Sequence, residues 1–162
     1  MSTIIVIGLF ISLSLLLFTK KALLLVSVSG TSMVPSLQPR DRVVAIRVFK
    51  QRLIQRQSIV ICDLSNVASI PFPKPVHVIK RVIALPGDEY RVRVEEIDPL
   101  VPLLSILETC GEYYILKLPP SHLFLSADGK GSDSRHWGPI PYNAVIGLVL
   151  LRIPRRQKET DN

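Results

Sequence analysis

The chain begins with a long apolar segment and continues as short runs in which apolar and polar residues alternate. Between Thr3 and Phe18 no charged side chain occurs. If Lys20 and Lys21 extend their ammonium groups to the membrane interface, an apolar helix from about Thr3 to about Leu24 reaches the roughly 20 residues that a bilayer span needs. The pattern therefore predicts an N-terminal membrane anchor over residues 1–24, a single transmembrane helix.

Two cleavable targeting segments are the alternatives to a retained anchor. A secretory signal peptide has a basic n-region and a small-residue A-x-A cleavage site, and this segment has neither. A mitochondrial transit peptide is rich in arginine, whereas the first arginine of this chain is Arg40. A retained anchor is favoured over both.

Beyond the anchor the apolar period changes to that of β-strands, with proline and glycine between the runs. The segment Asp98–Thr109 fits either a short helix or a loop. The expected strands are Leu24–Ser29, Arg42–Phe49, Ser58–Leu64, Val76–Leu85, Glu89–Glu95, Glu112–Leu118, His122–Ser126 and Ala144–Ile153. This pattern predicts a mainly β fold: an antiparallel β-sandwich or barrel-like body over residues 25–153, followed by a polar tail over residues 154–162.

Composition narrows the class of protein without choosing its function. A chain of 162 residues holds one compact domain. Its 48% of hydrophobic residues and mean hydropathy of +0.34 exclude a disordered chain. The net charge of +7 fits a nucleic-acid surface, an anionic membrane surface or a solvated basic face. Aromatic residues make up only 6%, which argues against a nucleic-acid face of interleaved aromatic and basic side chains.

The residues that usually bind metals are too scattered to predict a metal centre. Cys62 and Cys110 lack both C-x-x-C spacing and the further cysteines of a zinc site or a disulfide framework. His77, His122 and His136 contain no pair at the i, i+4 spacing of a helical metal site. We therefore expect no metal, and a core position for each cysteine.

A candidate nucleophile lies in the segment SGTSMVPSL, which begins at Ser29. Gly30 and Thr31 leave space around Ser32, and Pro35 fixes the direction of the chain after it. Such a turn suits a nucleophile whose backbone N–H faces an incoming carbonyl, because a bulky neighbour would block the substrate. A serine turn that satisfies only its own backbone is the alternative interpretation.

The serine needs a base, and Lys80 is the candidate. Ser32 is not part of a G-x-S-x-G motif, and the chain contains no S-x-x-K motif. Strand alternation in HVIKRVIAL places Lys80 on the same face as Val78, Val82 and Ala84. Burial on an apolar face lowers the pKa of a lysine, and a neutral lysine can act as a base. The alternative is a lysine that reaches solvent from the barrel edge or pairs with a carboxylate.

Three motifs, SGTSMVPSL, KRVIALPGD and DSRHWGPI, occur in the order found in type I signal peptidases, and the chain resembles this family over roughly residues 28–150. These are Ser/Lys proteases that include the mitochondrial inner membrane peptidase subunits. The resemblance implies that Ser32 is the nucleophile and Lys80 the general base. It implies a supporting role in the nucleophile turn or beside the site for Gly30, Met33, Pro35, Asp128, Ser132, Asp133 and Arg135. The backbone N–H of Ser32 is the implied oxyanion donor.

The sequence departs from the family pattern in the loop before Asp133. Only four residues separate Asp128 from Asp133, where the family has about six, and Ala127 replaces a glycine. Gly131 stands where the family has a serine that helps to orient the lysine. Ser132, one residue later, is the expected substitute.

The resemblance implies a membrane-bound endopeptidase that removes N-terminal signal peptides from exported preproteins without a cofactor. The substrate would bind as an extended strand, with small residues at the first and third positions before the cut. The implied partners are preproteins, the lipid bilayer and, for an organellar member, a second peptidase subunit. Nucleic acid is not expected to bind. The implied location is the cell membrane with the body extracytoplasmic, or the mitochondrial inner membrane with the body facing the intermembrane space.

Other observations favour different interpretations. The basic residues follow the anchor, so the positive-inside bias would place the body in the cytoplasm. A self-cleaving repressor-type protease uses a similar dyad but carries a DNA-binding helical domain instead of an apolar span. A non-enzymatic basic β-barrel that binds nucleic acid or anionic lipid would also explain the positive net charge.

Overall fold

The computed structural model describes residues 3, 5–10, 12–13, 22–47, 51–67, 70, 77–97 and 107–155. Half of the predicted anchor, residues 1–24, and most of the predicted tail, residues 154–162, lie outside these residues. Within the described ranges no helix has both the length and the apolar character that a membrane crossing requires. The anchor therefore stays a prediction.

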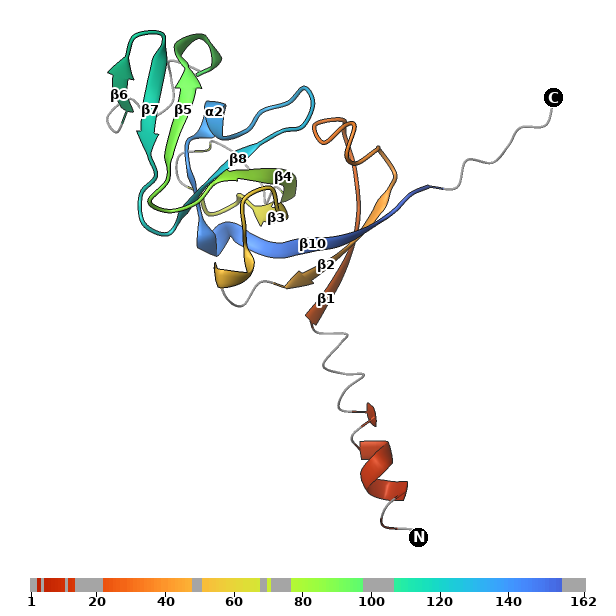
Figure 1. The fold of residues 1–162 in the computed structure, drawn as a ribbon. Coiled ribbons are helices and arrows are strands. Elements are labelled where there is room, and N and C mark those ends of the chain that lie inside the picture. Colours follow the sequence, from red (N-terminus) through yellow and green to blue (C-terminus); the bar gives the residue numbers. More distant parts are fainter. Residues whose placement is uncertain are drawn as a thin grey trace, which may run out of the picture.

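The larger of two antiparallel sheets has seven strands in the order β1-β2-β10-β3-β4-β8-β9 (Figure 1). Its strands are β1 (Leu23–Ser27), β2 (Arg42–Arg47), β3 (Ile59–Asp63), β4 (His77–Ala84), β8 (His122–Ser126), β9 (Ile140–Pro141) and β10 (Val145–Ile153). A three-stranded sheet, ordered β5-β7-β6, stands at one end of the molecule. It consists of β5 (Glu89–Arg93), β6 (Leu107–Cys110) and β7 (Tyr113–Lys117). The mainly β, antiparallel fold predicted from the sequence is confirmed.

The described helices are short. Besides the helical residues 3, 5–10, 12–13 and 22 near the N-terminus, they are α2 (Ser134–Trp137) and the 3₁₀ turns η1 (Gln51–Leu53), η2 (Val94–Glu96) and η4 (Tyr142–Ala144). Within the ambiguous segment Asp98–Thr109, residues 107–109 belong to strand β6, and residues 98–106 lie outside the described ranges.

Alternation along the strands accounts for the core. In β4, Lys80, Val82 and Ala84 are buried and the residues between them are only half-buried. Cys62 is buried, as predicted. The prediction of a core position for Cys110 is wrong: this cysteine is exposed. Its strand, β6, is an edge strand that pairs with β7 alone among the described strands.

A separate apolar cluster supports the segment between β1 and β2. It contains Val28, Met33, Leu37, Val43, Ala45 and Ile61. Met33 and Leu37 each keep only 2% of their surface exposed. Burial of such a side chain stabilises the fold by about 1.5–3 kcal/mol, so these two residues anchor the turn that carries Ser32.

Candidate active site

The turn that carries Ser32 is fixed on both sides by its own backbone. The N–H of Val34 donates to the carbonyl of Thr31 at 3.1 Å, and the N–H of Leu37 donates to that of Met33 at 2.8 Å. Gly30 precedes the turn with φ +79°, a conformation that glycine adopts without strain. Because Met33 points into the core, its neighbour Ser32 is left half-buried at the surface of a pocket.

Lys80 is a buried lysine, with only 3% of its surface exposed. Its backbone pairs with Val60 of β3. Among the described residues no carboxylate lies within 4.0 Å of its ammonium nitrogen. Burial lowers the pKa of Lys80, and the more distant carboxylates of Asp133 and Asp128 oppose part of that shift. The site therefore favours the neutral amine more than water does.

Ser32 and Lys80 line the same cavity, which has a volume of about 200 Å³. Its walls are residues 26–30 at the end of β1, residues 77–80 of β4, and Ser32, Met33 and Ile61. The sequence prediction that these two side chains belong to one site agrees with this placement. Their catalytic roles stay predictions.

The glycine loop, residues 127–132 between β8 and α2, lies against the turn that carries Ser32. The N–H of Gly129 donates to the Ser32 carbonyl at 2.9 Å. A Cβ at Gly131 would lie 2.7 Å from the Ser32 Cβ and 3.9 Å from the Lys80 Nζ. A Cβ at Gly129 would lie 2.8 Å from the carbonyl oxygen of Val34. Only glycine at 129 and 131 allows the loop to lie this close to the turn.

Asp128 binds Arg81, the residue next to Lys80 on β4. The Arg81 Nε donates to Asp128 Oδ1 at 2.7 Å, and Arg81 Nη2 donates to Oδ2 at 2.6 Å. Arg81 also donates to Ser36 Oγ and to the carbonyl of Gln57. The hydrogen bonds from Arg81 hold the pKa of Asp128 below its usual value. This bidentate pair joins β4 to the glycine loop.

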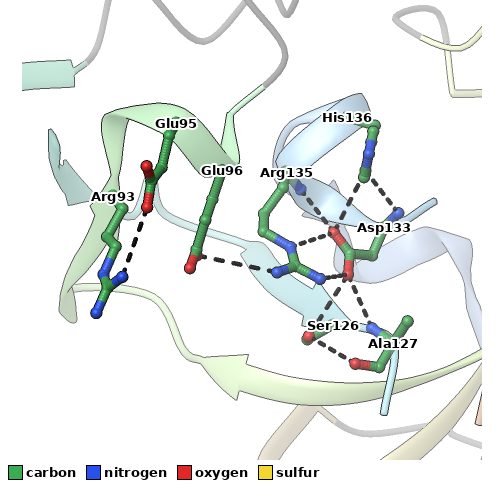
Figure 2. A network of polar contacts seen from close by, with 8 residues as sticks. All are labelled: Arg93, Glu95, Glu96, Ser126, Ala127, Asp133, Arg135 and His136. Carbon is green, nitrogen blue, oxygen red and sulfur yellow. Dashed lines mark hydrogen bonds and ion pairs between the residues drawn. The ribbon is translucent and has the colours of Figure 1, made fainter. Parts of the chain in front are cut away.

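Asp133 is a completely buried carboxylate at the start of α2 (Figure 2). It accepts hydrogen bonds from the backbone N–H of Ala127 and from both the backbone and the guanidinium of Arg135. Burial alone would raise the pKa of Asp133, but these hydrogen bonds outweigh it and keep the pKa below its usual value. The hydrogen bond from the Arg135 N–H to the Asp133 side chain caps the helix. A second hydrogen bond, from the N–H of Leu125 to Ser134 Oγ at 2.9 Å, connects the helix to β8.

Two of the other predicted site residues are exposed. Pro35 is exposed after a cis peptide bond. Ser132 is also exposed, and none of its described contacts reaches Lys80. The position that faces the lysine is Gly131, which has no hydroxyl to offer.

Sequence reasoning missed several residues that build the site. Arg81 and Gly129 contact the loop or the turn directly, and Trp137 places its ring 5.8 Å from the Lys80 Nζ. The adjacent basic pair Lys80-Arg81 was the available signal for the Asp128 contact, because one of two successive strand residues must face away from the other.

The known proteins that are similar to this chain are peptidases. The profile of the family described as "Signal peptidase, peptidase S26" matches residues 1–98, a range that includes Ser32 and Lys80. The chain is 31% identical over 128 residues to the mitochondrial ATP-independent inner membrane protease subunit 1a of Arabidopsis thaliana, covering 78% of this chain and 67% of that protein. It is 32% identical over 128 residues to the mitochondrial inner membrane protease subunit 1 of Mus musculus, covering 77% and 66%. It is 28% identical over 147 residues to the probable signal peptidase I-2 of Synechocystis sp., covering 83% and 66%.

The chain belongs to the signal peptidase family, peptidase S26. This confirms the family and the enzyme class predicted from the three motifs: a signal peptidase I-like serine peptidase. The chain spans about two thirds of the length of these curated relatives.

Proposed function

We propose that this protein is a membrane-anchored serine endopeptidase that removes N-terminal signal peptides from preproteins, with Ser32 as nucleophile and Lys80 as general base. The observation that carries the proposal is a buried lysine, with a lowered pKa, in the same cavity as a half-buried serine. A neutral lysine beside a serine can act as its general base, because a serine hydroxyl is a poor nucleophile until a base accepts its proton.

The proposed reaction needs only these two side chains and a backbone amide. Neutral Lys80 accepts the proton of Ser32 while the Ser32 oxygen attacks the scissile carbonyl carbon. The Ser32 N–H makes no hydrogen bond within the described residues and is available to the oxyanion. When the C–N bond breaks, the Lys80 ammonium gives its proton to the leaving amine. A water molecule then loses a proton to Lys80 and attacks the acyl carbon. As the ester C–O bond breaks, Lys80 returns this proton to the Ser32 oxygen, so both side chains are restored.

Open strand edges support binding of an extended peptide beside the dyad. β1 is an edge strand of the larger sheet. Residues 77–80 of β4 pair only with β3 among the described strands, because pairing with β8 begins at Arg81. A peptide that added itself here would bond through its backbone and point alternate side chains into the cavity. A cavity of about 200 Å³ favours small side chains at the first and third positions before the cut.

The proposal places the enzyme at a membrane. The apolar residues before β1 are its proposed anchor, and the three relatives named above include two that are named for the mitochondrial inner membrane. The body would lie on the side where signal peptides emerge, which is extracytoplasmic in a cell membrane and the intermembrane space in a mitochondrion. Both mitochondrial relatives are named as subunits, which supports a second peptidase subunit as a partner. Attachment of the enzyme to the same bilayer as the substrate raises the effective concentration of the enzyme near the cleavage site.

The test of the dyad uses the full chain in detergent and a preprotein with an A-x-A cleavage site. Ser32→Ala and Lys80→Arg should each abolish cleavage, because the first removes the nucleophile and a guanidinium cannot accept the proton. Activity of the wild type should fall as the pH drops through the lowered Lys80 pKa, since the ammonium is not a base. Ser65→Ala and Lys117→Arg, both outside the cavity, are the matched controls. Product formed by either dyad variant at the wild-type rate, as read by N-terminal sequencing, would overturn the proposal.

A further inference from the structure

Among the described residues, no polar side chain holds the amine of Lys80 in place. A lysine side chain is flexible and presents three rotatable donors. Among the described residues, however, its Nζ makes no hydrogen bond and no ion pair. Gly131, the residue whose Cβ would come within 3.9 Å of that nitrogen, carries no hydroxyl, and Ser132 is exposed. Something else must keep the amine beside Ser32.

Trp137 is the side chain whose ring lies close enough to the Lys80 Nζ to hold it. The centroid of its ring lies 5.8 Å from the Lys80 Nζ, within the roughly 6 Å over which a cation is attracted to an aromatic ring. The ring is half-buried and packs against the apolar core. Its backbone N–H donates to the carbonyl of Asp133 at 3.1 Å, so the buried cap of α2 also fixes the tryptophan.

We propose that Trp137 is the positioning residue of Lys80, holding the amine beside Ser32 through its ring face. The inference rests on the proposed function. The attraction acts on the charged ammonium, so it stabilises the state formed when Lys80 accepts the serine proton. Burial has the opposite effect, because it destabilises the ammonium and lowers the pKa of Lys80. The balance of the two effects sets how readily Lys80 accepts the proton of Ser32.

The other charged groups near Lys80 are already paired. Asp128 is bound by Arg81, and Asp133 is bound by Arg135. On β3, burial raises the pKa of Cys62 to about 12, so this thiol is uncharged. His77 lies at the exposed end of the cavity, 3.8 Å from Asp63. Trp137 is therefore the aromatic contact through which the protonation of Lys80 can be followed.

The chain has one tryptophan, which makes this contact accessible to spectroscopy. In the full chain in detergent, tryptophan emission should change as Lys80 titrates. The change should persist in Ser32→Ala and disappear in Lys80→Met. Biosynthetic replacement of the single tryptophan by fluorinated analogues weakens the ring's attraction for a cation while nearly keeping its shape. A weaker attraction stabilises the ammonium less and so lowers the pKa of Lys80. With a trifluorinated ring, the acid limb of the pH profile of kcat should therefore move to lower pH by about half a unit.

A pair of substitutions separates positioning from packing. Trp137→Leu should lower kcat by about ten- to a hundred-fold with little change in KM, because the amine loses its alignment. Tyr142→Leu is the matched control, since Tyr142 is a half-buried aromatic residue against the same core. It should lower the Tm but leave kcat and the acid limb in place.

Two results would overturn the inference. The first is an emission profile that Lys80→Met leaves unchanged. The second is an acid limb that stays in place or moves to higher pH with fluorination, which would mean that the ring only excludes water. Continued cleavage by Ser32→Ala would instead overturn the proposed function, and the emission of that variant still tests the contact with Trp137.

Discussion

Replacing Gly131 by alanine tests whether the glycine loop sets the position of Ser32. The added Cβ would lie 2.7 Å from the Ser32 Cβ, whereas two carbons in contact are about 3.5–4.0 Å apart. One of the two segments must therefore move by about 1 Å. Neither can move easily, because Met33 is buried in the core and the loop is fixed by the Gly129 hydrogen bond and the buried Asp133. A misplacement of this size at a reacting group costs about a hundred-fold in rate.

The assay compares kcat on a short peptide substrate with the Tm of each variant. Gly131→Ala should lose about a hundred-fold in kcat, with KM changed much less. Gly111→Ala is the control: its Cβ would meet nothing within 4 Å, but its φ of +61° makes alanine cost about 1–2 kcal/mol. That variant should lose stability and keep its kcat. If Gly131→Ala retains the wild-type kcat, the loop does not position the nucleophile.

Two further predictions concern the support of the site and the anchor. Asp133→Ala should lower the free energy of unfolding by about 3 kcal/mol, because it leaves Arg135 and the Ala127 N–H without their buried partner. Glu95→Ala, which removes an exposed ion pair with Arg93, should change nothing measurable (Figure 2). Because the pKa of Asp133 is lowered, its contribution is present above the ordinary carboxyl pKa and is lost as the pH falls through the lowered one, so urea unfolding of wild type and Asp133→Ala should converge in acid. Deletion of residues 1–21, ahead of β1, should spare cleavage of a soluble peptide and strongly reduce cleavage of membrane-inserted preproteins; equal losses on both would show that the segment belongs to the catalytic fold.

Most strands could be predicted because their burial alternates along the sequence. The clearest case is β4, where the predicted Val76–Leu85 corresponds to the observed His77–Ala84. Two strands were missed for different reasons. β9 is only two residues long and contains Pro141, and β6 has no alternating pattern because it lies at an edge of the small sheet.

The buried face of Lys80 was predicted from strand period alone, and the structure buries it. The supporting contacts could not be found in this way, because they join residues far apart in the chain. Arg81 and Asp128 are 47 residues apart, so the adjacent pair Lys80-Arg81 indicates that one basic side chain faces away from the other but does not identify its partner. The role of Gly131 is equally non-local, since it depends on a carbon atom that an alanine would place against Ser32.

Strand β10 occupies an unusual place in the order of the sheet. It lies between β2 and β3, although it is the last of the described strands along the chain. On one side it pairs with the hairpin of β1 and β2, whose connection carries Ser32, and on the other with β3, the neighbour of the strand that carries Lys80. During synthesis on the ribosome, a nascent chain that ends before residue 145 therefore lacks the strand that joins the two halves of the proposed dyad. A chain that is truncated before β10 should therefore lack cleavage activity, even though it contains both Ser32 and Lys80.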